Sequence, residues 1–154
     1  IPLRLVGSEM CIRDRPDTVD LADTLIMMGK KVLAPVLTDG HGRSLHEPAW
    51  AWYDSKNVRT GLWQIPEPIA PILPASAIDQ VEVVLCSALF VDRSGYRVGV
   101  GGGWYDRVLA HRADDVPVWA VVNDDEILDE VPHDPWDESV TAALTPSGLH
   151  MLGQ

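Results

Sequence analysis

Four short apolar runs, spaced widely along the chain, constrain the fold more than any other feature of the sequence. They cover residues 32–36, 81–86, 116–122 and 141–145 and are rich in valine, leucine and alanine. Runs of this length and composition are typical of strands that are buried on both faces. Because helical patterns separate some of the runs, we expect an α/β fold with three layers, α/β/α, around a mainly parallel sheet.

Two segments have helical spacing, and one long segment has neither pattern. The first helix is expected to start at Asp17 or Thr18 and to stop at Gly29, and the second is expected over 104–112. Residues 38–78 contain five prolines, which prevent long regular elements. In that segment we expect a short strand at 49–53, a turn of helix at 56–61, and packing of three tryptophans against the sheet: Trp50, Trp52 and Trp63.

Composition excludes several classes of protein. The chain has 154 residues, of which 46% are hydrophobic, so it suits one globular domain. Its apolar runs are far shorter than the roughly 20 residues of a membrane-spanning helix. The net charge of −11 argues against nucleic acid as a partner. Two cysteines are too few for a disulfide framework and suit the cytoplasm. We therefore expect a cytoplasmic protein without a membrane partner. A monomer is also expected, although composition does not determine the oligomeric state.

The first 15 residues differ in character from the rest. They begin with Ile1 and fit neither a signal peptide nor a helix. Residues 10–15 resemble the translated end of a sequencing adapter. We expect residues 1–15 to be a foreign or disordered segment that packs poorly, and residues 16–154 to form a single domain. A native but poorly ordered arm is the alternative.

A glycine-rich segment directly before the second helix carries the clearest chemical signal. Four glycines in five residues, with one valine among them, allow backbone N–H groups to approach an anion closely. Arg97 and Arg107 flank this loop with positive charge. Trp104 follows the last glycine, so the segment is not a Walker loop. Glycine-rich loops occur in many folds, and the loop alone is a weak signal.

The segment from Arg97 to Arg107 resembles the hallmark of the 5-formyltetrahydrofolate cyclo-ligases, Arg-x-Gly-x-Gly-Gly-Gly-Trp/Tyr-Tyr-Asp-Arg. The resemblance extends over about residues 16–147. Residues 61–68 (GLWQIPEP) are similar to the family's Gly-x-x-x-Ile-x-Glu-Pro turn. Residues 132–137 (PHDPWD), followed by Thr145, are similar to the family's Pro-x-x-x-x-Asp…Thr ending. Several motifs in the family's order are more specific than the loop alone.

The resemblance implies an ATP- and Mg²⁺-dependent conversion of 5-formyltetrahydrofolate, with or without a polyglutamate tail, to 5,10-methenyltetrahydrofolate. It implies catalytic roles for Arg97 and Tyr105, and Mg²⁺ ligation by Asp106 and Asp137. The residues implied to bind ATP are Arg97, Gly99, Val100, Gly101, Gly102, Gly103, Trp104 and Tyr105. Those implied to bind folate are Gly101, Gly102, Gly103, Trp104, Tyr105 and Glu67.

Several of these residues have a plainer interpretation. Asp106 is also what the first turn of a helix favours, and Asp137 lies in an acidic stretch where Asp134 is its nearest competitor. Glu67 is also a candidate for bracing a turn. Trp104 either stacks on the pterin or packs against its neighbours. Cys86 sits in an expected strand and is interpreted as a core residue rather than a nucleophile.

The sequence also departs from the family pattern. A glutamate is expected directly before Pro16, and Arg15 stands there. The family's helical segment before Pro16, which contributes basic residues to the ATP site, is not reproduced by Arg4, Arg13 and Arg15. We therefore expect weak or no turnover. Two further hypotheses stay open: a non-catalytic module that binds MgATP or folate, and an unrelated nucleotide-sugar or CoA-binding α/β domain.

Overall fold

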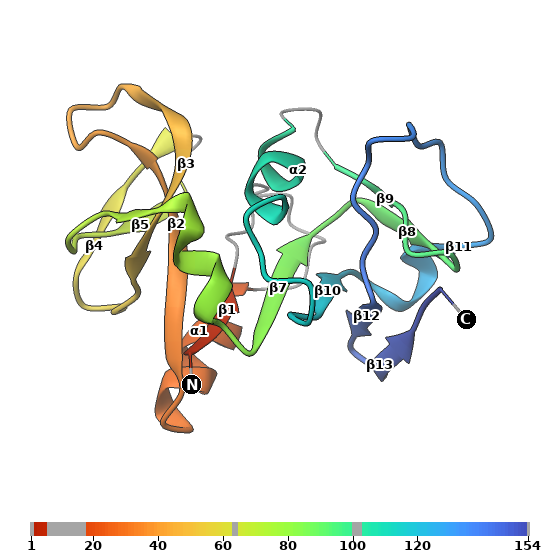
Figure 1. The fold of residues 1–154 in the computed structure, drawn as a ribbon. Helices are drawn as coiled ribbons and strands as arrows, with labels where there is room; N and C mark the ends of the chain where they lie inside the picture. The colour runs from red at the N-terminus through yellow and green to blue at the C-terminus, as the bar shows by residue number, and fades with distance from the viewer. Residues whose placement is uncertain (1, 6–17, 63–64, 100–102, 154) are drawn as a thin grey trace.

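A mixed sheet of eight strands forms the centre of the computed structural model, which describes residues 2–5, 18–62, 65–99 and 103–153 (Figure 1). In spatial order the strands are β13 (Gly148–Met151), β12 (Ala142–Thr145), β10 (Val118–Val121), β7 (Val83–Ser87), β1 (Pro2–Leu5), β2 (Lys31–Thr38), β3 (Ser44–Trp52) and β6 (Leu73–Pro74). The four predicted runs are all strands, with ends that differ from the prediction by at most two residues.

The sheet is parallel in its centre and antiparallel at both edges. The five strands from β12 to β2 run parallel to one another. The antiparallel neighbours are β13 on one side and β3 and β6 on the other. The loops of residues 146–147 and 39–43 are too short for a crossover, so each produces a hairpin. The prediction of an α/β fold is confirmed, whereas the sheet is mixed.

Strand β1 lies between β2 and β7 and pairs with both in parallel. Residues 2–5 therefore occupy the middle of the sheet, and the expectation that residues 1–15 pack poorly is wrong for them. Extended backbone beside two open strand edges satisfies the N–H and C=O groups of all three strands, whatever the origin of the segment. Residues 6–15 lie outside the described part of the chain, and their foreign origin stays a prediction.

The two faces of the sheet are covered by different helices. Helix α1 (Thr18–Met27) places Ala22 in a core cluster with Val32, Val83, Leu85 and Val121. Helix α2 (Trp104–Leu109) and the 3₁₀ helix η2 (Ala75–Gln80) pack in the larger cluster on the other face, which includes Leu33, Val84, Cys86, Val118, Ala120 and Ala143. Neighbouring residues of one strand thus enter opposite clusters, as the two-residue period of a strand requires.

Residues 38–78 form more strand than the prolines indicated. Strand β4 (Val58–Thr60) pairs with β5 (Pro66–Pro68), so the predicted helical turn at 56–61 is wrong. The Asp54 carboxylate accepts the Lys56 N–H at 3.0 Å and turns the chain, and β4 then pairs in extended form. Trp50 is fully buried as predicted, whereas Trp52 is 41% exposed, and Trp63 lies outside the described residues.

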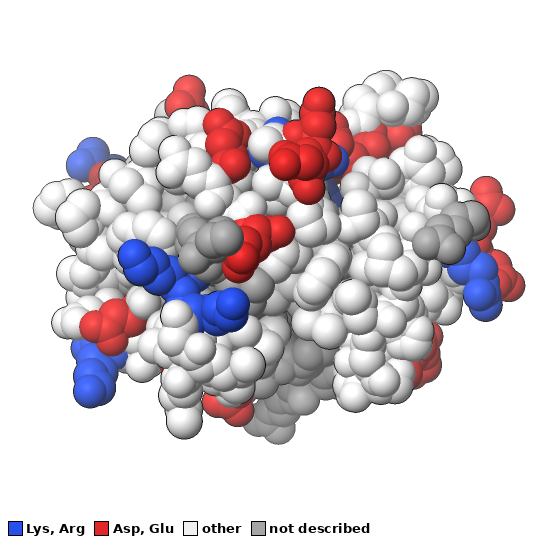
Figure 2. Space-filling model, turned by 60° about the horizontal axis from the view of Figure 1, so that its bottom comes forward, with Lys and Arg blue, Asp and Glu red and all other residues white. Residues whose placement is uncertain are grey.

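A second small sheet lies on the far side of the molecule from β4 and β5, on the right of Figure 1. It contains β8 (Phe90–Asp92), β9 (Arg97–Val98) and β11 (Ile127–Leu128), in the order β11-β8-β9, and the 3₁₀ helix η3 (Asp124–Glu126) leads into β11. On the face drawn in Figure 2, the described basic side chains form a few small groups, set among acidic and uncharged ones. Among the described helices none has the length and apolarity needed to span a membrane.

Candidate active site at the carboxyl edge of the sheet

Arg97 lies on the β8–β9 hairpin, and hydrogen bonds to the buried Asp92 hold the turn of this hairpin. The Asp92 carboxylate accepts N–H groups from Ser94 at 2.9 Å, Tyr96 at 3.0 Å and Val131 at 3.0 Å. Gly95 has a φ of +93°, and a Cβ there would lie 2.3 Å from the Val140 carbonyl oxygen. The sequence predicted the turn at 94–95, and the positive φ explains why it needs glycine.

Arg97 reaches from β9 to the first turn of α2. Its Nη2 donates to Asp106 Oδ1 at 2.9 Å, and its guanidinium carbon lies 5.4 Å from the centre of the Tyr105 ring. The Arg97 side chain is only 6% exposed, and its buried Nε has no hydrogen-bond partner among the described residues. The Asp106 carboxylate is 34% exposed. The pair therefore combines a buried cation with an acid that solvent and ligands can reach.

The start of α2 is held by its own backbone and by aromatic packing. Gly103 is the N-cap residue and has a φ of +61°, which a β-carbon disfavours. The Trp104 ring contacts the buried Trp50 ring edge to face, with centroids 5.3 Å apart. This contact favours the packing interpretation of Trp104, and pterin stacking stays a prediction. Val100, Gly101 and Gly102, which are predicted to bind ligands, lie outside the described residues.

Tyr105 points into the protein, toward the carboxyl end of β7. It is 7% exposed, and its hydroxyl lies 2.9 Å from Ser87 Oγ. The Ser87 N–H also donates to the phenol oxygen, at 3.4 Å. The sequence analysis missed Ser87, because one serine at the end of a strand has no distinguishing pattern. Only the position of Ser87 as the last residue of a parallel strand, at the edge where α/β sites form, was a usable signal.

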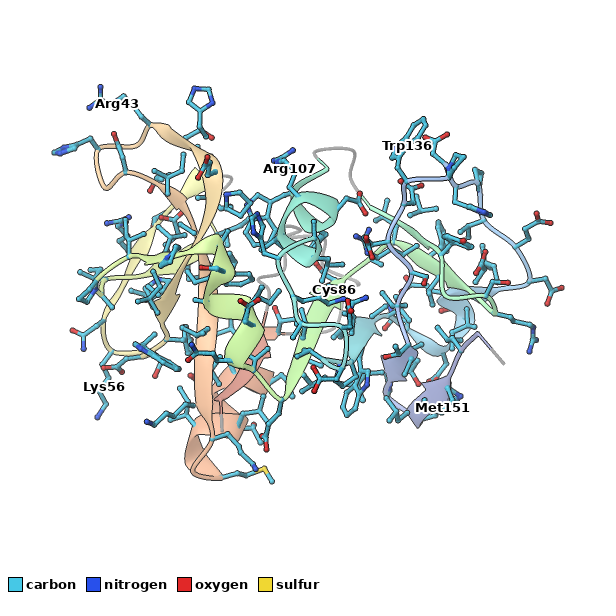
Figure 3. All side chains as sticks on the ribbon, viewed as in Figure 1. Arg43, Lys56, Cys86, Arg107, Trp136 and Met151 are labelled. Carbon is cyan, nitrogen blue, oxygen red and sulfur yellow. The ribbon has the colours of Figure 1, made fainter. Side chains whose placement is uncertain are left out.

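Cys86 is confirmed as a core residue. Its side chain is fully buried beneath α2, whose Arg107 lies on the outer side of the helix (Figure 3). Burial raises the pKa of the thiol, and the nearby Arg97 guanidinium only partly offsets that rise. A thiol held in its neutral form makes a poor nucleophile.

Asp137 lies in the loop after β11, whose exposed Trp136 marks its position in Figure 3. Two contacts connect this loop to the Arg97–Asp106 region. The His133 and Tyr96 rings stack with centroids 3.5 Å apart, and Glu138 lies 3.8 Å from Arg112, just beyond α2. The Asp137 carboxylate accepts the Asp134 N–H at 2.7 Å. The tertiary structure thus brings the loop of the second predicted metal ligand to the side of α2.

Glu67 lies in a different place, on β5 beside the end of β2. It is fully buried, and its Oε1 accepts the Leu37 N–H at 2.9 Å. Its Oε2 accepts from Thr38 Oγ1 at 2.7 Å and from Arg59 Nη2 at 3.3 Å. Both carboxylate oxygens are used within the chain. This geometry favours the bracing interpretation, and direct folate contact by Glu67 stays a prediction.

The fold and the site together define a class: α/β proteins that bind their ligands where parallel strands end. Strands β2 and β7 are parallel and separated only by β1, so Thr38 and Ser87 lie on the same edge of the sheet. Tyr105 lies against Ser87, and the buried Arg97 and the reachable Asp106 carboxylate lie beside Tyr105.

Comparison with known proteins gives the particular family. The model of the 5-formyltetrahydrofolate cyclo-ligase family matches residues 8–146, and the chain belongs to this family. The 5-formyltetrahydrofolate cyclo-ligase of Mycolicibacterium smegmatis is 39% identical over 148 residues, which cover 94% of this chain and 76% of that protein. That of Escherichia coli K12 is 30% identical over 135 residues, covering 85% and 71%. The family match begins inside the segment expected to be foreign.

Solved structures show the same fold. The 5,10-methenyltetrahydrofolate synthetase of Aquifex aeolicus aligns with a TM-score of 0.75 at 20% identity, covering 99% of this chain and 72% of that one. The enzyme of the same name from Mycoplasma pneumoniae aligns with a TM-score of 0.59 at 17% identity, covering 91% and 71%. The resemblance identified in the sequence is therefore confirmed at the level of family and fold.

Proposed function

We propose that this chain converts 5-formyltetrahydrofolate and ATP to 5,10-methenyltetrahydrofolate, ADP and phosphate. The observation that supports this most directly is the Arg97–Asp106 ion pair at the start of α2, in a member of the cyclo-ligase family. Phosphoryl transfer needs little covalent chemistry from a protein and relies on positioning and charge neutralisation. A buried arginine, a glycine-containing loop and a reachable carboxylate are groups that supply both.

The loop from Arg97 to Tyr105 is proposed to bind ATP and folate. An added Cβ at Gly99 would meet no atom of the described residues within 4 Å. Arg97 and Tyr105 are proposed to act on the reaction by holding Asp106 and the loop in position, because both side chains are buried. A direct contact of either side chain with ATP stays a prediction.

Asp106 and Asp137 are proposed to hold Mg²⁺ together with phosphate oxygens. Mg²⁺ usually takes one or two carboxylates plus phosphates and water, and it requires oxygen ligands. The partly exposed Asp106 carboxylate fits this requirement. Bound Mg²⁺ would neutralise charge on the phosphates.

The proposal extends to properties of the whole protein. We infer a three-layer α/β/α arrangement, supported by α1 and α2 on opposite faces of the sheet. We also propose a cytoplasmic monomer that accepts folate with or without a polyglutamate tail. The net charge of −11 repels both anionic ligands at long range, so local positive groups such as Arg97 must offset that repulsion.

A non-catalytic module that binds MgATP or folate is the second candidate function. Arg15 in place of the expected glutamate favours it, because a cation replaces an acid next to Pro16. Membership of the cyclo-ligase family excludes the third hypothesis, an unrelated nucleotide-binding domain.

An absorbance assay of methenyltetrahydrofolate formation distinguishes the two candidate functions. The chain is given 5-formyltetrahydrofolate and MgATP together, and the increase in product absorbance is followed. Turnover supports the enzyme, and binding of MgATP without turnover supports the module. Under both, Asp106→Asn is expected to weaken Mg²⁺-dependent ATP binding at least tenfold, since it removes a charged ligand. Asp114→Asn, which changes an exposed acid just after α2, is the matched control. Equal ATP affinity for the two variants would contradict the assignment of Asp106.

A further inference from the structure

We propose that Ser87 is a positioning residue, which fixes Tyr105 and through it the start of α2. The inference rests on the proposed function, because it assigns to Ser87 the task of holding the segment that binds MgATP. It starts from one contact: Ser87 Oγ lies 2.9 Å from the Tyr105 hydroxyl, with the Ser87 N–H 3.4 Å from the same oxygen.

The surroundings of this contact make it directional. The Tyr105 ring belongs to the larger core cluster, with Cys86, Val84 and Val108, and the phenol oxygen is the polar atom that it carries into that cluster. A hydroxyl in an apolar cluster is stable where hydrogen-bond partners are held in place, as Ser87 is. The hydrogen bond to Ser87 selects one position of the ring, and hence one position of the helix start.

The same ring connects Ser87 to the predicted metal ligand. The Arg97 guanidinium faces the Tyr105 ring at 5.4 Å and binds Asp106 at 2.9 Å. Asp106 also follows Tyr105 directly in α2. A shift of the Tyr105 ring would therefore move Asp106 in two ways, through the helix backbone and through Arg97. Ser87, at the end of a parallel strand buried in the sheet, is the rigid end of this series of contacts.

Single and double variants test the proposal with two measurements on the full chain: amide hydrogen exchange without ligand, and MgATP affinity. Ser87→Ala is expected to speed exchange about tenfold at residues 104–109 while other amides keep their rates, and to weaken MgATP binding about tenfold, or ~1.4 kcal/mol. Tyr105→Phe is expected to do the same. The double variant should lose no more than Tyr105→Phe alone, because that variant already removes both hydrogen bonds between the two residues.

Two controls separate positioning from general stability. Ser87→Thr keeps the hydroxyl and is expected to stay within about twofold of the wild type in both measurements. Ser76→Ala removes an exposed hydroxyl in η2 and should change neither. Additive losses in the double variant, exchange that rises throughout the sheet, or unchanged exchange in Ser87→Ala would each overturn the proposal.

The two measurements also keep this proposal apart from the proposed function. If the wild type does not bind MgATP, the proposed function fails. Faster exchange confined to residues 104–109 in Ser87→Ala would still support Ser87 as the positioning residue. If the wild type binds MgATP and Ser87→Ala binds equally well, the positioning role is overturned and the proposed function stands.

Discussion

At the scale of single residues, Glu67 shows how this chain uses a buried charge. Its carboxylate is fully buried, but a backbone N–H, a hydroxyl and the Arg59 guanidinium surround it. These partners belong to β2 and β4, so one side chain joins three strands. A buried charge with such partners is stable, while loss of any partner leaves it poorly compensated.

Gly61 makes room for this arrangement, and its substitution is the first prediction. A Cβ at position 61 would lie 2.5 Å from Glu67 Cδ. Gly61→Ala is therefore expected to displace the carboxylate and to destabilise the protein by about 2 kcal/mol, measured by urea unfolding. Gly99→Ala is the matched control, because its added Cβ meets none of the described residues within 4 Å. Equal stability of the two variants would show that Glu67 moves at no cost.

At the scale of elements, a polar cluster joins the ends of β10 and β12 to β13. Asp124, just after β10, accepts hydrogen bonds from the hydroxyls of Thr145, at 2.5 Å, and Ser147. His150 on β13 lies 3.1 Å from both hydroxyl oxygens. These contacts fasten the edge hairpin to the parallel part of the sheet. The sequence analysis did not anticipate the cluster, because its members come from three elements.

This cluster predicts a pH-dependent stability. The Ser147 and Thr145 hydrogen bonds lower the pKa of Asp124 below its ordinary value. A carboxyl with a lower pKa in the folded state stabilises the fold above its unfolded pKa, about 3.9, and loses that contribution as the pH falls through the folded value. Asp124→Asn should therefore be less stable than the wild type at pH 7 by urea unfolding. The difference should shrink below about pH 4.

The exposed neighbour Asp125 provides the control for this pH dependence. Asp125→Asn is expected to leave the pH profile of unfolding unchanged. Among the described residues, the hydroxyls of this cluster donate to the Asp124 carboxylate and not to that of Asp125. A stability difference for Asp124→Asn that stays constant from pH 7 to pH 3 would be inconsistent with the role of its charge.

At the scale of the whole molecule, the sheet depends on its central strand. Removal of residues 1–5 would leave β2 and β7 with open edges in the interior. We expect the shortened chain to lose cooperative unfolding and to aggregate, as followed by circular dichroism and size-exclusion chromatography. Removal of Ile1 alone, which precedes the strand, is the control. A shortened chain that unfolds like the wild type would instead support the foreign origin of residues 1–15.

Local sequence determined the features that depend on residues close together along the chain: the main strands, a helix end, a turn and the motif of the glycine loop. Apolar runs specified the strands, Gly29 and Gly95 matched positive-φ positions at a helix end and a turn, and the motif around the glycine loop identified the family. Each of these signals lies within about ten residues, where backbone conformation and side-chain period are expressed directly.

Only the tertiary structure decided which strands pair and which residues contact the buried polar side chains. Pairing of β1 between β2 and β7, burial of Glu67 against Thr38, and the contact of Ser87 with Tyr105 all join residues that are distant in sequence. Strand order, and the partner of a buried polar group, depend on which surfaces meet when the chain collapses. No sequence period or motif predicts hydrogen bonds between such surfaces. The contacts that support the site are therefore known only from the assembled sheet.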